Sequence, residues 1–293
     1  MAHTAAAAAA AGTSADTAAG TSADFDVRGL IDGVTLLAST ANVVMQLARP
    51  AVGYGVLESK VEDGQVMRHP VRRIRNTITY LSVALMGTAE ERSILRREVN
   101  RSHAMVRSSA DSPVRYSAFD PELQLWVAAC LYRGAVDIHM LLHGPADDAT
   151  ADAIYRECRR LGTTLQVPGH MWPADRAAFE RYWASGMAEI RIDPPVREYL
   201  DRLIGLDYLP RPLAVAFGPV NRFLTAGFLP PPFREQMRVR WAGREQRQFA
   251  LLMRLIASAC QFRPAPVSRF PFNACLYAWR LQAAGKRVVR RIC

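Results

Sequence analysis

A long apolar stretch that begins after Asp120-Pro121 constrains the fold more than any other part of the chain. Asp120 is a typical N-cap residue, and a proline at the first helical position is compatible with a helix start. From Glu122 to about Leu142, apolar side chains occur on nearly every side of the predicted helix. A helix without a polar face requires other helices around it. The sequence therefore predicts an all-α fold with this helix at its centre.

Further helical segments, separated by prolines and glycines, precede and follow this helix. Strand-like alternation never persists for more than a few residues, which favours a single multi-helix domain over residues 25–293. The other predicted helices cover 29–48, 70–87, 88 to about 107, 149–161, 244–259 and 272–284, with further starts at Pro173, Pro194, Pro212 and Pro230. Gly53 and Gly55 indicate a turn or a close backbone approach within 50–58.

The composition fits a folded domain that follows a short leader. With 293 residues and 50% hydrophobic content, the chain can bury a sizeable core. Residues 1–24, built mainly from Ala, Thr, Ser, Gly and Asp, predict a disordered leader that lacks the basic start of a signal peptide. Five scattered cysteines contain no CxxC pair and no zinc spacing, which favours a reducing compartment. Because no run of about 18 uninterrupted apolar residues occurs, we expect no spanning helix and a cytoplasmic protein.

The net charge of +10 permits binding to nucleic acid or to an anionic membrane surface, but it identifies neither. Basic residues are spread among acidic ones over most of the chain. The one concentrated basic patch lies near the C-terminus and consists of Lys286, Arg287, Arg290 and Arg291. We interpret it as a solvated tail, with phosphate binding or peripheral membrane contact as the alternative. No recognition-helix signature or glycine-rich phosphate loop is present, so we expect neither nucleic acid nor a nucleotide cofactor.

The segment after Gly87 carries a histidine into an apolar stripe. Thr88 and Glu91 have the spacing of a capping box, which predicts a helix start. One face of the helix that follows carries Leu95, Val99, His103 and Val106, with Arg107 one turn beyond His103. A neutral imidazole that points into an apolar pocket is a typical proximal ligand of a haem iron. The alternative is a buried histidine whose ring bonds to a backbone carbonyl.

Five segments occur in the order in which a known family carries them. They are 47–56 (LARPAVGYGV), 72–77 (RRIRNT), 102–107 (SHAMVR), 116–127 (YSAFDPELQLWV) and 179–183 (FERYW). Over about residues 30 to 280, the chain resembles the MpaB and latex-clearing-protein oxygenases, which are all-helical proteins that bind haem b. The resemblance implies the same fold and a haem b cofactor that reacts with O2 or a peroxide.

The resemblance also implies roles for individual residues. His103 matches the proximal iron ligand, and Arg107 matches a basic residue four positions after it. Arg73 and Thr77 match an arginine and a threonine on the distal side of the haem in rubber-cleaving members. Asn76 stands where those members can have a lysine that competes for the iron, and an amide cannot ligate in the same way. Without the resemblance, a surface arginine is an equally good interpretation of Arg73. For Thr77, a helix residue that packs its methyl group is then the better interpretation.

Three positions depart from the family pattern. Ala128 follows Trp126-Val127 where many members have a histidine, and Asn100 stands where an arginine usually precedes the ligand by three. Ser59 replaces a histidine that often follows the Gly-Val segment. Because alanine has a small, apolar side chain, we expect a roomier and less polar pocket at Ala128, in which a histidine would be tolerated.

Two other groups of side chains have spacings known from metal sites. His139 and His143 fall on one helix face, but Met140-Leu-Leu142 between them lacks the glutamate of a zinc protease, so we favour a structural or substrate-pocket role. Asp147, Asp148 and Asp152 could collect a divalent ion, yet at a helix start they more simply complement the helix dipole.

The sequence thus predicts a haem-b-dependent oxygenase that acts on a lipophilic or aromatic small molecule, with O2 or a peroxide as the oxidant. The missing histidine at Ala128 is compatible with a specialised biosynthetic tailoring enzyme. The alternative is a family member without catalysis or without haem, which serves as a binding or scaffold protein.

Overall fold

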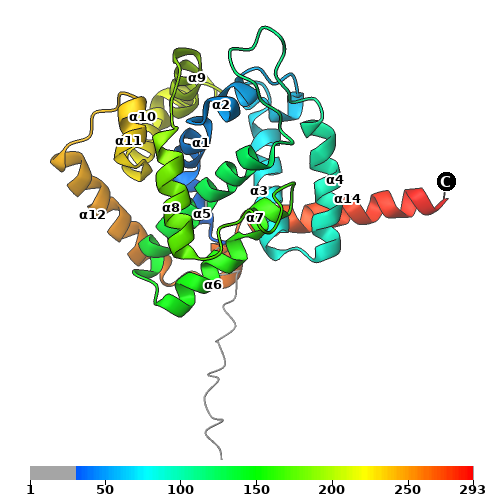
Figure 1. The fold of residues 1–293 in the computed structure, drawn as a ribbon. Coiled ribbons are helices and arrows are strands. Elements are labelled where there is room, and N and C mark those ends of the chain that lie inside the picture. Colours follow the sequence, from blue (N-terminus) through cyan, green and yellow to red (C-terminus); the bar gives the residue numbers. More distant parts are fainter. Residues whose placement is uncertain (1–30, 293) are drawn as a thin grey trace, which may run out of the picture.

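The structure is a computed structural model, and it describes residues 31–292 (Figure 1). The predicted leader, residues 1–24, lies outside the described residues. The described helices are η2 (Gly33–Ala38), α1 (Ser39–Leu47), α2 (Pro50–Leu57), η3 (Glu62–Gly64), α3 (Pro70–Met86), α4 (Ala89–His103), α5 (Pro121–His143), α6 (Asp148–Cys158), α7 (Arg160–Thr163), α8 (Arg176–Ala188), α9 (Pro194–Ile204), α10 (Arg211–Phe228), α11 (Pro231–Gln236), α12 (Gly243–Cys260), α13 (Ala265–Ser268) and α14 (Phe272–Ile292). Within 31–292 the only β-pairing is an isolated bridge between Arg107 and Ser117. The all-α prediction is confirmed.

Helix α5 lies at the centre, as its apolar sequence predicts. Asp120 caps it by accepting hydrogen bonds from the backbone N–H groups of Glu122 and Leu123. The helix packs against α1, α6, α7, α12 and η2, and Ala129 and Cys130 are fully buried. In the described part, α5 is the one helix that is long and apolar enough to cross a membrane by composition alone. Its packing is that of a core helix.

Aromatic side chains join α5 to α8. The Trp126 ring is 0% exposed and stacks on Trp183 at a centroid distance of 5.1 Å. Its Nε1 donates to the backbone carbonyls of Met45 and Gln46, both at 3.2 Å. A Cβ at Gly186 would lie 2.5 Å from the Trp126 ring, so only glycine permits this close approach of α8. The stack therefore couples α1, α5 and α8 in one core.

Helices α3 and α4 form an antiparallel hairpin that α14 crosses. The capping box is confirmed, since Thr88 accepts from the backbone of Glu91 and Glu91 accepts from the backbone of Thr88. Leu276 and Trp279 of α14 pack against Val83 and Leu95 of the hairpin. This packing fixes the hairpin at its closed end and leaves the other end available for a site.

Two predicted boundaries are wrong for local reasons, and the two alternatives for 50–58 are resolved. This segment is helix α2 and not a turn, whereas the predicted close backbone approach is confirmed at Gly53, where a Cβ would lie 2.7 Å from the Leu47 carbonyl. The 29–48 helix begins as a 3-10 segment in its described part. Gly162 does not end the helix before it, because it lies buried inside α7.

Candidate functional site

His103 is the last residue of α4, so the helix ends four residues earlier than predicted. The backbone N–H of Ala104 bonds to Asn100 and that of Val106 bonds to His103, which turns the chain out of the helix. Arg107 therefore does not lie one helical turn beyond His103. It is exposed and pairs with Ser117 in the isolated bridge. The predicted histidine remains at the helix end, but Arg107 leaves in another direction.

The His103 ring is partly buried. Its Nδ1 is buried without a hydrogen-bond partner among the described residues, so the alternative of a ring bonded to a backbone carbonyl through this atom does not hold. Phe119 contacts the ring edge-on at a centroid distance of 6.3 Å. Burial, and next the positive charge of Arg73, lower the pKa of His103 to about 4. The imidazole is therefore neutral at neutral pH, which is the form that binds metals.

Arg73 stands opposite this histidine at the open end of the hairpin. With a rise of about 1.5 Å per residue, Arg73 and His103 each lie roughly 20 Å along their helices from the connection at Gly87. Helices α3 and α4 run side by side (Figure 1), and the charge of Arg73 acts on the His103 ring. The hairpin geometry thus brings together the two residues that the sequence singles out.

The first two turns of α3 have no buried face. Every residue from 71 to 77 is exposed, whereas Ile78 after them is buried. Even so, desolvation lowers the pKa of Arg73, because protein surrounds this accessible side chain on most sides. Thr77 donates its hydroxyl to the Arg73 carbonyl at 3.0 Å, which leaves the oxygen free to accept.

Exposed apolar side chains lie near this polar pair. Val71 and Ile74 are close to Arg73 in the chain, Met105 follows His103 by two residues, and Phe119 contacts the His103 ring. All four are exposed. A few polar groups among accessible apolar ones are typical of a site for a small lipophilic molecule.

Tyr199 of α9 is a site residue that the sequence analysis missed. It is partly buried, desolvation raises its pKa, and the nearby charge of Arg73 opposes that rise. Arg73 therefore lies between a histidine from α4 and a phenol from α9. No periodicity or motif around Tyr199 points to this position, because it depends on how α9 packs against α1, α2 and α10.

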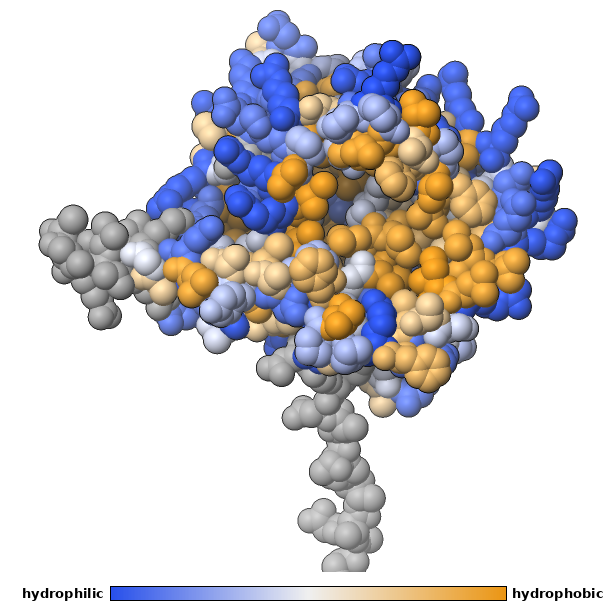
Figure 2. All heavy atoms as spheres, turned by 180° about the vertical axis from the view of Figure 1, so that it is seen from behind, coloured by the Kyte–Doolittle hydropathy of each residue, from blue (hydrophilic) through white to orange (hydrophobic). Residues whose placement is uncertain are grey.

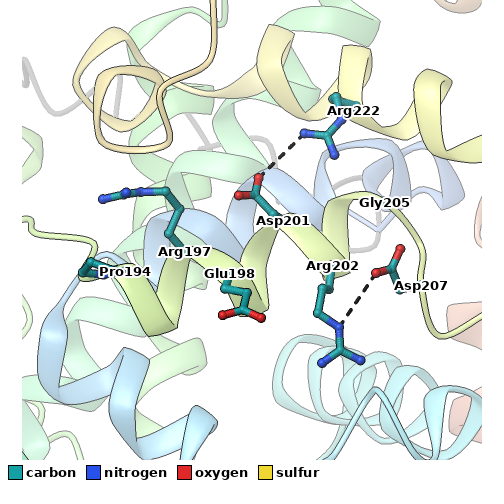
Figure 3. A pocket seen from close by; sticks show the side chains of 8 residues that line it. All are labelled: Pro194, Arg197, Glu198, Asp201, Arg202, Gly205, Asp207 and Arg222. Atoms are coloured by element: carbon teal, nitrogen blue, oxygen red, sulfur yellow. Dashed lines mark ion pairs between the residues drawn. The ribbon is translucent and has the colours of Figure 1, made fainter.

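A separate depression of about 400 Å³ is lined by α9, the turn after it and Arg222 of α10 (Figure 3). Charged side chains dominate it, and Asp201 and Asp207 pair with Arg222 and Arg202 at 3.7 and 3.8 Å. The residues that line it are Pro194, Arg197, Glu198, Asp201, Arg202, Gly205, Asp207 and Arg222. None of the predicted site residues belongs to it, and its charges largely neutralise one another.

The departures Asn100 and Ser59 have structural roles. The Asn100 side chain accepts from the Gln166 side chain, and Gln166 exchanges hydrogen bonds with Gln124 of α5. This chain of amides ties α4 to α5 directly behind the His103 turn. Ser59 accepts from the backbone of Val61 and holds the turn after α2.

Ala128 corrects the expectation of a roomier pocket. The residue is 1% exposed, and a Cβ at Gly162 of α7 would lie 3.3 Å from its methyl group. Two small residues thus let α5 and α7 approach closely, and the position leaves no space for an imidazole. The roomier pocket is therefore wrong, whereas the tolerance of the fold for histidine stays a prediction, with an overpacking cost of about 1–3 kcal/mol.

The other predicted constellations do not form metal sites in the described residues, where no three His, Cys, Asp or Glu side chains lie close enough to hold an ion. His139 and His143 contact each other at a centroid distance of 5.0 Å. Asp147 caps α6 through the backbone of Thr150, as the helix-dipole interpretation predicts. Asp148 and Asp152 both pair with Arg176 of α8.

Comparison with known proteins identifies the family. Residues 28–258 match the family model described as ER-bound oxygenase mpaB/B'/rubber oxygenase, catalytic domain. The chain belongs to this family. Similar proteins are an uncharacterized protein of Mycobacterium bovis and one of Mycobacterium tuberculosis, each 50% identical over 255 residues, which cover 87% of this chain and all of the relative. No solved structure matches the chain. As a member of the mpaB/rubber-oxygenase family, the protein has an oxygenase-type catalytic domain, and the match includes both α3 and α4.

Proposed function

We propose that this protein is a haem-b-dependent oxygenase that acts on a lipophilic or aromatic small molecule. The observation that carries the proposal is that His103 and Arg73 lie near each other at the open end of the α3–α4 hairpin, where the charge of Arg73 acts on the imidazole. The residues present fit a haem, since the proposed ligand is neutral and its Nδ1 bonds to no described group. When bound, haem b supplies an iron that reacts with O2 or a peroxide.

His103 is the residue that would hold the iron. Because its pKa is about 4, the ring offers a lone pair at neutral pH without first losing a proton. Its position at the end of α4 fixes the ring from one side, while Phe119 limits its rotation from the other. A ligand held by a helix end and an aromatic contact is oriented before the cofactor arrives.

Arg73 and Thr77 would supply polar groups on the opposite side. Arg73 keeps its positive charge although desolvation lowers its pKa, since an arginine titrates far above neutral pH. A guanidinium in a partly dry site stabilises developing negative charge more strongly than one in water. Thr77 adds an acceptor oxygen one turn away, and the uncharged Asn76 lies exposed beside it.

The substrate class follows from the side chains around the pair. Val71, Ile74, Met105 and Phe119 expose apolar surface near Arg73, Thr77 and His103. Such a lining favours a substrate that is recognised by shape and burial rather than by charge. Arg107 is exposed and outside α4, where a guanidinium could pair with a haem carboxylate. A biosynthetic tailoring reaction is compatible with this lining.

The experiment that tests the proposal is titration of the purified full chain with hemin, followed by absorbance and by far-ultraviolet circular dichroism. We expect a Soret band that His103→Ala abolishes or shifts while helicity is kept. The matched control is His170→Ala, because His170 is an exposed histidine outside the site. A wild-type protein that does not bind hemin would instead support a binding or scaffold protein. Equal spectra for His103→Ala and wild type would exclude His103 as the ligand.

A further inference from the structure

Positive charge is concentrated in the last part of the chain. Residues 208–293 contain 15 Lys and Arg but only two acidic residues, Glu235 and Glu245. Residues 1–207 contain 22 Lys and Arg and 25 Asp and Glu. The net charge of the protein therefore comes from its C-terminal part as a whole, and not from a terminal patch within an otherwise balanced chain. The excess of positive charge thus begins well before the terminal patch of Lys286, Arg287, Arg290 and Arg291.

The same part of the chain exposes most of the large apolar side chains. Of 16 such exposed side chains in the described residues, 11 lie beyond residue 208, which makes them neighbours in sequence of the excess positive charge. They include Phe217, Leu251, Leu255, Phe262, Phe270 and Tyr277. Helices α10 and α12 lie on the left in Figure 1 and therefore on the right in Figure 2, which shows the molecule from behind. Apolar side chains gather on that side of Figure 2, with hydrophilic ones at the margin. Monomeric proteins rarely leave such apolar surface in water without a partner.

Helix α12 combines both features on one face. Arg247, Leu251, Arg254 and Leu255 are separated by helical steps of four, three and one, and all four are exposed. Phe262, which follows the helix, is 89% exposed. Arginine can place its apolar stem along a lipid surface while its guanidinium reaches the headgroups. This arrangement is that of a helix that lies on a membrane with its leucines in the interface.

We infer that α10, α12 and the segment 261–271 form a docking surface for a lipid bilayer with anionic headgroups. Charge complementarity selects this partner, since an anionic surface attracts each nearby arginine. A second copy of the chain would bring two strongly positive surfaces together, which like-charge repulsion opposes. Nucleic acid would leave Phe262 and the leucines of α12 in water. The inference does not depend on haem binding.

The test is co-sedimentation of the full chain with vesicles of phosphatidylcholine alone and of phosphatidylcholine mixed with phosphatidylglycerol. We expect binding to the mixed vesicles that weakens as salt is added. Arg247→Gln/Arg254→Gln should weaken it about 30-fold, since each basic residue near an anionic surface contributes about a fivefold gain. Leu251→Gln/Leu255→Gln should weaken it on the order of tenfold by removing apolar burial.

The matched control is Arg156→Gln/Arg181→Gln, which removes the same charge from exposed positions on α6 and α8. These helices lie on the near side in Figure 1, which Figure 2 turns away from the viewer. The control should bind almost like wild type, and circular dichroism should be unchanged in all three variants. If the control weakened vesicle binding equally, net charge alone would explain the effect, and the proposed docking surface would be wrong. Three other results would overturn the proposal. They are a wild-type protein that binds neither kind of vesicle, a wild-type dimer that Leu251→Gln/Leu255→Gln dissociates, and tighter binding of the wild type to RNA than to the mixed vesicles.

Discussion

Trp126 and His103 are both rings held by helices, but their surroundings differ. Trp126 is fully buried, stacked on Trp183 and bonded through Nε1, so each of its groups has a partner. His103 leaves Nδ1 buried without one, and the charge of Arg73 acts on its ring. An unpartnered atom alone does not mark a site, since Trp172 in the core also lacks a partner for Nε1. What distinguishes the hairpin end is a desolvated but accessible arginine together with a neutral imidazole.

This difference separates residues that maintain the fold from residues that are available for chemistry. A satisfied and close-packed ring contributes stability, and its loss leaves a cavity. Side chains at the hairpin end contribute much less to stability, because the exposed residues from 71 to 77 bury little surface on folding. Mutations in the two regions should therefore affect different measurements.

The largest expected effect on stability comes from Trp126→Ala. Removing this ring deletes the stack on Trp183 and leaves an empty space next to Gly186. We expect the free energy of unfolding to fall by about 3–5 kcal/mol, measured by urea denaturation. The matched control is His170→Ala, an exposed change that should stay within about 0.5 kcal/mol. A loss below about 1 kcal/mol for Trp126→Ala would contradict the stated packing.

Arg73→Ala should show the opposite behaviour. Its side chain is exposed, so the free energy of unfolding should change by less than about 0.5 kcal/mol. In hemin-loaded protein, turnover in a peroxide-dependent dye oxidation assay should fall by a factor on the order of 10² to 10³, if the guanidinium stabilises developing negative charge. The Soret band should persist. Wild-type turnover would show that Arg73 has no part in the reaction.

Ala128→His tests whether the core tolerates a family-like residue. Ala128 and Gly162 leave no space between α5 and α7, so the imidazole would force the helices apart. We expect a loss of about 3 kcal/mol in unfolding free energy. The double variant with His170→Ala should lose no more than the single one. Unchanged stability for Ala128→His would mean that α7 moves aside at no cost.

Much of the fold could be predicted from the sequence, because its signals are local. The Asp120 cap, the Thr88 capping box and the apolar surface of α5 each act within a few residues. The parts that could not be predicted depend on contacts between distant segments. Tyr199 reaches Arg73 only through the packing of α9, and Gly162 meets Ala128 only through the packing of α7.

The site itself was predicted through the resemblance more than through periodicity. Helical stepping places Arg107 one turn beyond His103, but α4 ends at the histidine, so the assumed continuation of the helix fails there. The pairing of Arg73 with His103 follows from simple hairpin geometry, since both lie at similar distances from Gly87. The environment that lowers both pKa values could not be seen in the sequence, because it comes from surrounding helices.

The smallest expected effect is a pH dependence of stability in haem-free protein. Folding lowers the pKa of His103 from about 6.5 to about 4, so between these values the unfolded chain binds a proton that the folded protein does not. Stability is therefore full above about pH 6.5 and falls as the pH approaches 4. At pH 5 the loss should be about 2 kcal/mol relative to pH 7. Asp137, whose pKa burial raises to about 6, acts with the opposite sign.

Because Asp137 contributes equally to both proteins, the measurement is the difference between wild type and His103→Gln in urea denaturation at pH 7 and pH 5. Wild type should lose about 2 kcal/mol more than the variant between the two values. In Arg73→Ala the loss should be smaller, because one of the two causes that lower the pKa of His103 is removed while burial remains. An equal pH dependence in wild type and His103→Gln would mean that the ring is solvated, and the contrast with Trp126 could then no longer rest on a buried, unpartnered imidazole nitrogen.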